Sequence, residues 1–114
     1  MSKTVPNIHG PIIEAYIESI RPDNPEIRKE LDFTYSFDGK EAILYVVRPV
    51  YNDPKRTLKL EFAKIKFNGT KKEWNLYWMR ASGRWEAYPP LPRAKNLETI
   101  IGALKEDAIG CFHG

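Results

Sequence analysis

The feature that most constrains the fold is a strict alternation of apolar and polar residues over 31–38. This period of two predicts a strand with one buried face. Asp38-Gly39 ends the alternation, and this dipeptide is typical of a tight hairpin turn. Residues 41–48 then form a nearly continuous apolar run, typical of a central strand covered on both faces, which Pro49 is predicted to end. The chain is therefore predicted to fold around an antiparallel sheet.

Three further strands are predicted over residues 58–67, 73–81 and 84–88. The first of them changes parity, because Leu58, Leu60 and Phe62 alternate before Ala63, Ile65 and Phe67 take over. If both sets face the core, a β-bulge is required near Phe62-Ala63. The "NGTKK" loop and the "SGR" turn then reverse the chain twice. Five strands joined by tight turns predict an antiparallel meander.

Helical spacing of apolar residues appears at the two ends of the chain. Residues 11–21 and 97–108 are predicted helices, the second capped by Asn96 and stopped by Gly110. Asn24-Pro25 predicts a short helical turn before the first strand. Because helices and strands are segregated, we expect a single α+β domain over residues 1–114. Its five-stranded antiparallel meander is flanked by the two helices, most simply on one face, with the other face partly open.

The distribution of charge is more informative than its sum. The net charge of +3 is too small by itself to imply a polyanionic partner. Between Lys59 and Lys95, however, nine Lys and Arg residues stand against three Glu, and the same segment holds all three tryptophans. A basic, tryptophan-rich face is therefore expected on this part of the sheet.

Cysteine usage and hydropathy indicate a compartment. Cys111 is the only cysteine, so no internal disulfide can form and a reducing environment is expected. The first ten residues lack the apolar core of a signal peptide, and no run approaches the roughly 18 apolar residues of a membrane span. These features favour a soluble cytoplasmic protein with no membrane partner.

The tryptophan-rich segment contains a candidate anion site. In the simplest register about the "SGR" turn, Arg80 lies opposite Trp85, with Arg84 in the turn itself. Extension of this register across the sheet brings Arg48 to the same end. Guanidinium groups beside an aromatic ring can hold a carboxylate or a phosphate. The alternative is that these arginines are solvated or form internal ion pairs, for example with Glu61.

The opposite face of the same strands is a second candidate. Tyr77 is predicted to share that face with Met79, Tyr45 and Lys59, and Lys64 and Lys66 join them if the bulge turns them outward. Aromatic residues set among cations on a sheet are how several proteins bind single-stranded nucleic acid. Any half-exposed sheet face has a similar composition, and the chain contains no RNP-type, helix-turn-helix or zinc-finger motif.

Catalytic and metal chemistry find little support. Cys111 and His113 stand close to the end of the chain without a third orienting group, and together with His9 they fall short of the four ligands of a structural zinc site. We therefore expect no catalytic residue, no metal and no cofactor.

A series of motifs resembles a known family. An Arg-Pro pair closes an apolar strand, a Trp-x-Leu-Tyr-Trp strand and a Trp-x-x-Tyr-x-Pro strand follow, and the last helix leads into "GCFHG". This order is similar to that of the small bacterial proteins called domain of unknown function 3024. The matching positions are Arg48, Lys64, Trp74, Trp78, Arg80, Trp85, Tyr88, Pro90, Asp107, Gly110, Phe112 and Gly114. His113 departs from the pattern, in which an aromatic residue is more usual.

The resemblance implies a compact domain in the bacterial cytoplasm and supplies no activity, substrate or cofactor. It also implies a docked C-terminal segment in which Phe112 covers the sheet near Trp85.

Together these observations predict a non-enzymatic binding module for an anionic partner, either nucleic acid or a phosphorylated small molecule. The residues expected to contact it are Arg48, Arg80, Arg84, Trp85, Lys64 and Tyr77. The alternative is a protein–protein adaptor or a self-associating domain, such as a homodimer, that uses the same sheet or an exposed strand edge.

Overall fold

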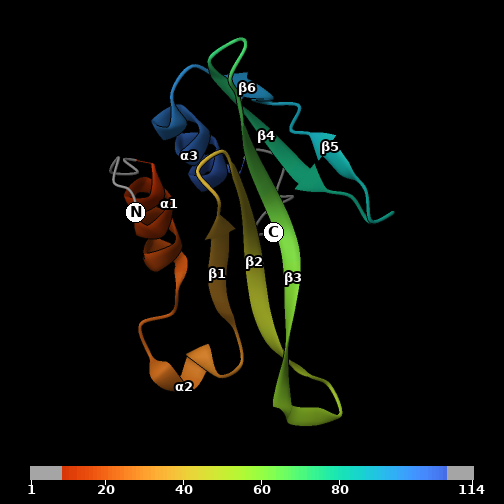
Figure 1. The fold of residues 1–114 in the computed structure, drawn as a ribbon. Helices are drawn as coiled ribbons and strands as arrows, with labels where there is room; N and C mark the ends of the chain where they lie inside the picture. Colours follow the sequence, from red (N-terminus) through yellow and green to blue (C-terminus); the bar gives the residue numbers. More distant parts are fainter. Residues whose placement is uncertain (1–8, 108–114) are drawn as a thin grey trace, which may run out of the picture.

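A computed structural model describes residues 9–107 of the chain and shows three helices and six strands in this range (Figure 1). In chain order the elements are α1 (Gly10–Ile20), α2 (Pro25–Arg28), β1 (Asp32–Phe37), β2 (Glu41–Val50), β3 (Asp53–Asn68), β4 (Glu73–Met79), β5 (Trp85–Ala87), β6 (Arg93–Ala94) and α3 (Leu97–Glu106). The expectations for Gly110, Cys111, Phe112 and His113 lie outside the described residues.

The strands form one antiparallel sheet in the order β1-β2-β3-β4-β5, so the predicted five-stranded meander is confirmed. A helix precedes the strands and another follows them, as expected of the α+β class.

The sixth strand was not predicted. The proline-rich stretch "PPLPR" follows the end of β5, and Arg93 and Ala94 then pair with Asn75 and Trp74 of β4. A proline carbonyl still accepts hydrogen bonds, and the N–H of Leu76 donates to the carbonyl of Pro92 at 3.0 Å. The prolines therefore bend the chain without removing it from the edge of β4.

Helix α1 begins one residue before the predicted start and ends one residue before the predicted end, whereas α3 begins where its cap predicts and ends two residues early. The Asn96 side chain accepts a hydrogen bond from the N–H of Thr99 at 2.9 Å and starts α3. That helix ends at Glu106, because Asp107 adopts a left-handed conformation with φ 45°. Asn24 caps the short α2 in the same way, through the N–H of Glu26. This confirms the predicted turn before the first strand.

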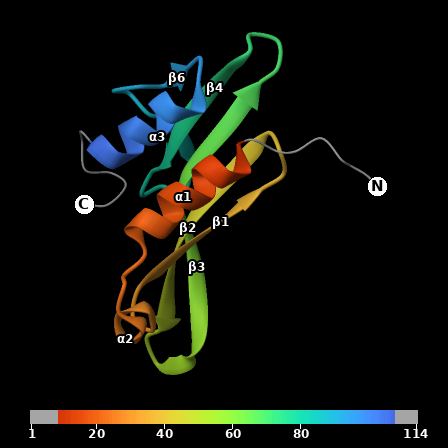
Figure 2. The same cartoon turned by 90° about the vertical axis from the view of Figure 1, so that its left-hand side faces the viewer.

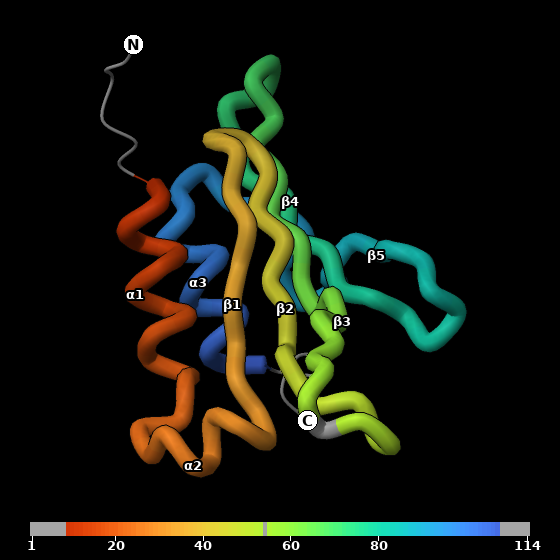
Figure 3. The backbone as a smooth tube through the Cα atoms, turned by 60° about the horizontal axis from the view of Figure 1, so that its bottom comes forward, coloured from red at the N-terminus to blue at the C-terminus, as the bar shows by residue number. Residues whose placement is uncertain are grey.

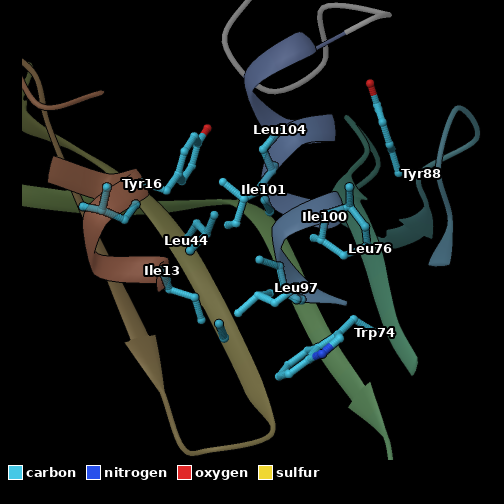
Figure 4. Packing of buried hydrophobic residues seen from close by; sticks show 14 of the residues in the cluster. Ile13, Tyr16, Leu44, Trp74, Leu76, Tyr88, Leu97, Ile100, Ile101 and Leu104 are labelled. Carbon is cyan, nitrogen blue, oxygen red and sulfur yellow. The ribbon is translucent and has the colours of Figure 1, made fainter. Parts of the chain in front are cut away.

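Both long helices cover the same face of the sheet, which we call the inner face (Figures 1 and 2). Figure 4 shows the side chains that meet there, from α1, from α3 and from the sheet that both helices cover. Those fully shielded from solvent and largest in volume are Tyr16, Tyr88, Ile13, Leu44, Ile65, Leu76, Leu97, Ile100 and Leu104. Burial of this apolar surface is the main stabilising contribution to the fold.

The central strand β2 is covered on one face only. Ala42 and Leu44 are buried, whereas Ile43 and Tyr45, which alternate with them, are half-buried. The continuous apolar run of this strand therefore does not indicate cover on both faces. Its second face stays accessible because both helices pack on the first.

Strand β2 also continues past Pro49 to Val50, so the prediction that this proline ends the strand is wrong. The neighbouring strand β1 begins at Asp32, opposite Val47. Pro49 therefore lies where β2 has no partner on the β1 side, and a missing N–H is tolerated at such an edge.

The predicted β-bulge is present in β3. Leu44 pairs with Ala63 and the next residue, Tyr45, pairs with Glu61, so Phe62 is the extra residue. Phe62 and Ala63 are consequently both buried, one after the other. The bulge sends Lys64 and Lys66 to the face opposite the helices.

Strand β3 is longer than predicted, and only its C-terminal part is paired on both sides. It pairs with β2 at Asp53 and again from Thr57 onward, but β4 reaches it only from Ala63 to Asn68. Beyond that point β4 and β5 turn away from β3 (Figure 3). We call residues 55–61 the free edge of β3.

Candidate functional site

The face of the sheet opposite the helices, which we call the outer face, carries most of the candidate residues. The pairing register places Lys64 directly opposite Tyr77, between the buried pairs of the inner face. Side chains alternate along a strand, so the same face collects residues from four strands. The principal ones are Tyr45, Lys59, Lys64, Lys66, Asn75, Tyr77, Met79 and Trp85.

Trp85 also lies on this face, whereas the sequence predicted it on the other one. The predicted register about the "SGR" turn is wrong by one residue. Trp85 pairs with Met79, and not with Arg80. The turn is closed by the N–H of Arg80, which donates to the carbonyl of Arg84 at 2.9 Å. A slip of one residue moves every side chain of a strand to the other face. Trp85 therefore joins Tyr77 and leaves the face of Trp78.

Lys64 lies between the two aromatic rings of this cluster. Its ammonium nitrogen is 4.8 Å from the ring centroid of Tyr77 and 5.2 Å from that of Trp85. Both distances are within the range of a cation–π interaction. Residues from three consecutive strands are thus held together, and all three side chains are half-buried. We call Lys64, Tyr77 and Trp85 the aromatic–lysine cluster.

The pattern of a cation over a ring recurs elsewhere on the outer face. The ammonium of Lys59 lies 5.9 Å from the ring centroid of Tyr45. On the other side of the aromatic–lysine cluster, Lys66, Asn75 and Tyr77 line a shallow pocket of about 340 Å³ near the β3–β4 loop. Asn75 was not singled out from the sequence, although its alternation with Tyr77 was a sufficient signal.

The predicted arginine site is only partly assembled. Arg80, Arg84 and Trp85 line one open pocket of about 710 Å³ at the β4–β5 turn. Arg48 does not line it, and instead pairs with Leu58 in the lower half of the sheet. The three arginines and Trp85 are therefore not gathered in a single pocket.

Arg80 has a carboxylate partner, which is Glu86 and not the expected Glu61. The closest nitrogen–oxygen distance between them is 2.7 Å, and the guanidinium carbon of Arg80 also lies 5.8 Å from the ring centroid of Trp78. Both side chains of the ion pair are exposed, at 54% and 40%. Exposed pairs of this kind contribute little to stability.

Other kinds of site receive no support from the described residues. Within 9–107, no three His, Cys, Asp or Glu side chains gather in a way that would hold a metal ion. None of the helices in that range has the length and the apolar character needed to span a bilayer.

The fold and the outer face define a small α+β protein with an antiparallel sheet, covered by helices on one face and basic and aromatic on the other. A family model described as "Domain of unknown function (DUF3024)" matches residues 2–114, so the chain belongs to this family. No curated protein and no solved structure matches the chain.

Proposed function

We propose that this protein is a non-enzymatic module that binds single-stranded nucleic acid on the outer face of its sheet. In this proposal bases stack on Tyr77 and Trp85, and Lys64 and Lys66 hold the phosphates. Arg84, at the open end of the cluster, extends the contact to the next phosphate.

The observation that carries the proposal is the position of Lys64 between two half-buried rings on a face that none of the described helices covers. A ring that is half accessible offers a surface to an unpaired base, and every base has such a surface. The neighbouring ammonium groups supply the charge that follows the backbone. The same three residues therefore provide both components of single-strand recognition.

A single strand suits this face better than a duplex. The bases of a duplex are stacked on one another and do not offer their rings to a protein surface, whereas unpaired bases can be splayed onto a sheet. Within residues 9–107, no helix projects from the outer face in the way that a helix enters a major groove. Stacking on Tyr77 and Trp85 requires unpaired bases.

The bacterial cytoplasm is the compartment that we propose for this activity. A single cysteine, Cys111, leaves the chain without an internal disulfide, which suits a reducing compartment where nucleic acid is present.

The direct test is a titration of labelled oligothymidylate and oligouridylate, followed by fluorescence anisotropy. With about three phosphate contacts, we expect the affinity to fall roughly twenty-fold as salt rises from about 50 to about 200 mM. Trp85→Ala and Tyr77→Ala should each weaken binding by roughly 5- to 150-fold, the range found for loss of one stacked base.

Two matched controls make the test specific. Tyr51→Ala removes a fully exposed tyrosine at the β2–β3 turn, and Lys105→Ala removes an exposed lysine of α3. Neither should change the affinity by more than about two-fold. Equal losses of affinity in Trp85→Ala and Tyr51→Ala would exclude the proposal. So would an affinity for a duplex or for a mononucleotide that equals the affinity for the single-stranded oligonucleotide.

A further inference from the structure

We propose that the free edge of β3 binds an extended acidic polypeptide segment, which adds to the sheet as a further strand. This site is separate from the aromatic–lysine cluster and does not depend on nucleic-acid binding. It corresponds to a recognised mode of peptide recognition, in which backbone hydrogen bonds supply affinity and alternate side chains supply specificity.

The first observation is that the backbone of this edge lacks a neighbour. Residues 57–61 pair with β2 on one side, while β4 reaches β3 only from Ala63 onward, and no other strand among the described residues takes its place. All the side chains from Lys55 to Glu61 are exposed. An unpaired row of N–H and C=O groups on an exposed strand is a template for another chain.

The bulge at Phe62 fixes which backbone groups are available. The N–H of Phe67 donates to the carbonyl of Lys40, toward β2, and the direction alternates along the strand. The extra residue inverts that alternation, so the N–H groups of Thr57 and Lys59 are directed away from β2. An added strand would pair with these groups.

The side chains of the edge define the partner's chemistry. Thr57, Lys59 and Glu61 alternate on the outer side and Leu58 and Leu60 on the inner side, and the exposed Lys55 and Arg56 directly precede them. Leu58 and Leu60 are 48% and 47% exposed, unusual for leucines in a strand. Three cations stand against one carboxylate, so the complementary strand is acidic opposite the cations and apolar opposite the leucines.

The charges also disfavour most pairings with a second copy of the chain. An antiparallel pair centred on Thr57 would set Lys55 against Lys59, and one centred on Lys59 would set that lysine against itself. Like charges directly opposite are destabilising. Pairings centred on Leu58 or Leu60 avoid both, and self-association in those registers is an outcome that the experiment distinguishes.

The probe is a synthetic peptide of about seven residues, enough to span Lys55 to Glu61. The sequence Thr-Val-Glu-Val-Thr-Glu-Glu, run antiparallel to β3, places valines opposite Leu60 and Leu58 and glutamates opposite Lys59, Arg56 and Lys55. We expect binding to the full chain by anisotropy. We also expect slower hydrogen exchange at the amides of Thr57 and Lys59 when the peptide is bound.

Backbone methylation separates strand addition from simple charge attraction. Two methylated forms of the peptide are compared, one with methyl groups on the odd-numbered backbone amides and one with methyl groups on the even-numbered amides. Only one of these two sets of amides faces β3, and the charge of the peptide is the same in both forms. We expect only the form that is methylated on the amides facing β3 to lose binding. Equal binding of both methylated peptides would overturn the proposal.

A charge exchange tests the position. Lys55→Glu combined with Lys59→Glu should weaken the acidic peptide roughly ten-fold and favour the same peptide with lysine in place of glutamate. The matched control is Lys29→Glu combined with Lys105→Glu, which changes two exposed lysines, one just after α2 and one in α3, and should leave both affinities unchanged. Equal effects of the two double variants would place the peptide elsewhere.

Sedimentation of the chain without peptide tests whether a second copy of the chain occupies the free edge of β3. A monomer supports the proposal. A dimer whose Thr57 and Lys59 amides are already protected would overturn it, because a second copy would then hold the edge.

Discussion

At the scale of single residues, one ion pair joins the N-terminal helix to the sheet. The guanidinium of Arg21, just after α1, contacts both carboxylate oxygens of Asp32, at 2.8 and 3.0 Å. The same carboxylate accepts the N–H of Phe33 at 2.8 Å. The hydrogen bond from Arg21 is the main reason that the pKa of Asp32 lies below its ordinary value of 3.8.

This pair makes the stability of the fold dependent on pH. Because the folded pKa of Asp32 is lowered, its contribution is fully present above the ordinary pKa and is lost as the pH falls through the folded pKa. We expect Asp32→Asn to lower the melting temperature at neutral pH, and the difference from the parent to shrink progressively below about pH 4. Thermal unfolding between pH 2 and pH 7 would measure this.

Asp23→Asn is the control, since Asp23 is an exposed aspartate in the connection between α1 and α2. It should leave the melting temperature and its pH dependence unchanged. A constant difference between the parent and Asp32→Asn across the whole range would contradict the assigned role of the charge.

At the scale of elements, hydrophobic period predicted more than turn chemistry did. The change of parity after Phe62 predicted the bulge correctly, because two buried sets on one strand have no other solution. The register at Trp85 was wrong because a turn containing Gly83 closes equally well with one residue more or fewer. Strand β6 could not be predicted from alternation, because its two residues, Arg93 and Ala94, are too few to show a period.

The β3–β4 hairpin stores backbone strain at Lys72, which has φ 52°. A side chain in this left-handed region costs energy that glycine does not incur. We expect Lys72→Gly to raise the free energy of unfolding by up to about 1 kcal/mol, measured by urea denaturation. Lys71→Gly, next to it in the same exposed loop, should be neutral or destabilising, because no left-handed φ occurs there. Equal changes in the two variants would contradict the assignment of strain.

At the scale of the whole molecule, the sheet has a covered upper half and an uncovered lower half (Figures 1 and 2). The helices shield one face of the upper half, whereas the β2–β3 hairpin extends beyond them. The sequence predicted helices on one face. It did not predict the extension, because the apolar alternation of Leu58 and Leu60 is the same for a buried strand and for an exposed one.

Two leucines of adjacent strands test this division. Leu44 is 0% exposed and Leu60 is 47% exposed, although both side chains point to the inner side. We expect Leu44→Ala to cost about 2–5 kcal/mol of unfolding free energy through loss of packing and a residual cavity. Leu60→Ala should cost less than about 1 kcal/mol. Similar losses in the two variants, measured by denaturation, would mean that the lower half is covered in solution.

The candidate site was predicted in its residue types and only partly in its geometry. Alternation placed Tyr77 and Lys64 together, but the grouping of Trp85 with Arg80 depended on a register that one turn residue decides. Arg48 was grouped with them by extending that register over several strands. An error of one residue in one hairpin is carried into every strand beyond it.

The distribution of the three indoles gives the protein a built-in optical reporter. Trp74 is buried in the core at 2% exposure and Trp78 lies on the same inner face, while Trp85 alone is on the outer face. An indole emits at longer wavelength as water reaches it. The emission of Trp85 therefore reports contacts with the open side of the sheet. The emission of Trp74 is insensitive to such contacts and changes when the domain unfolds.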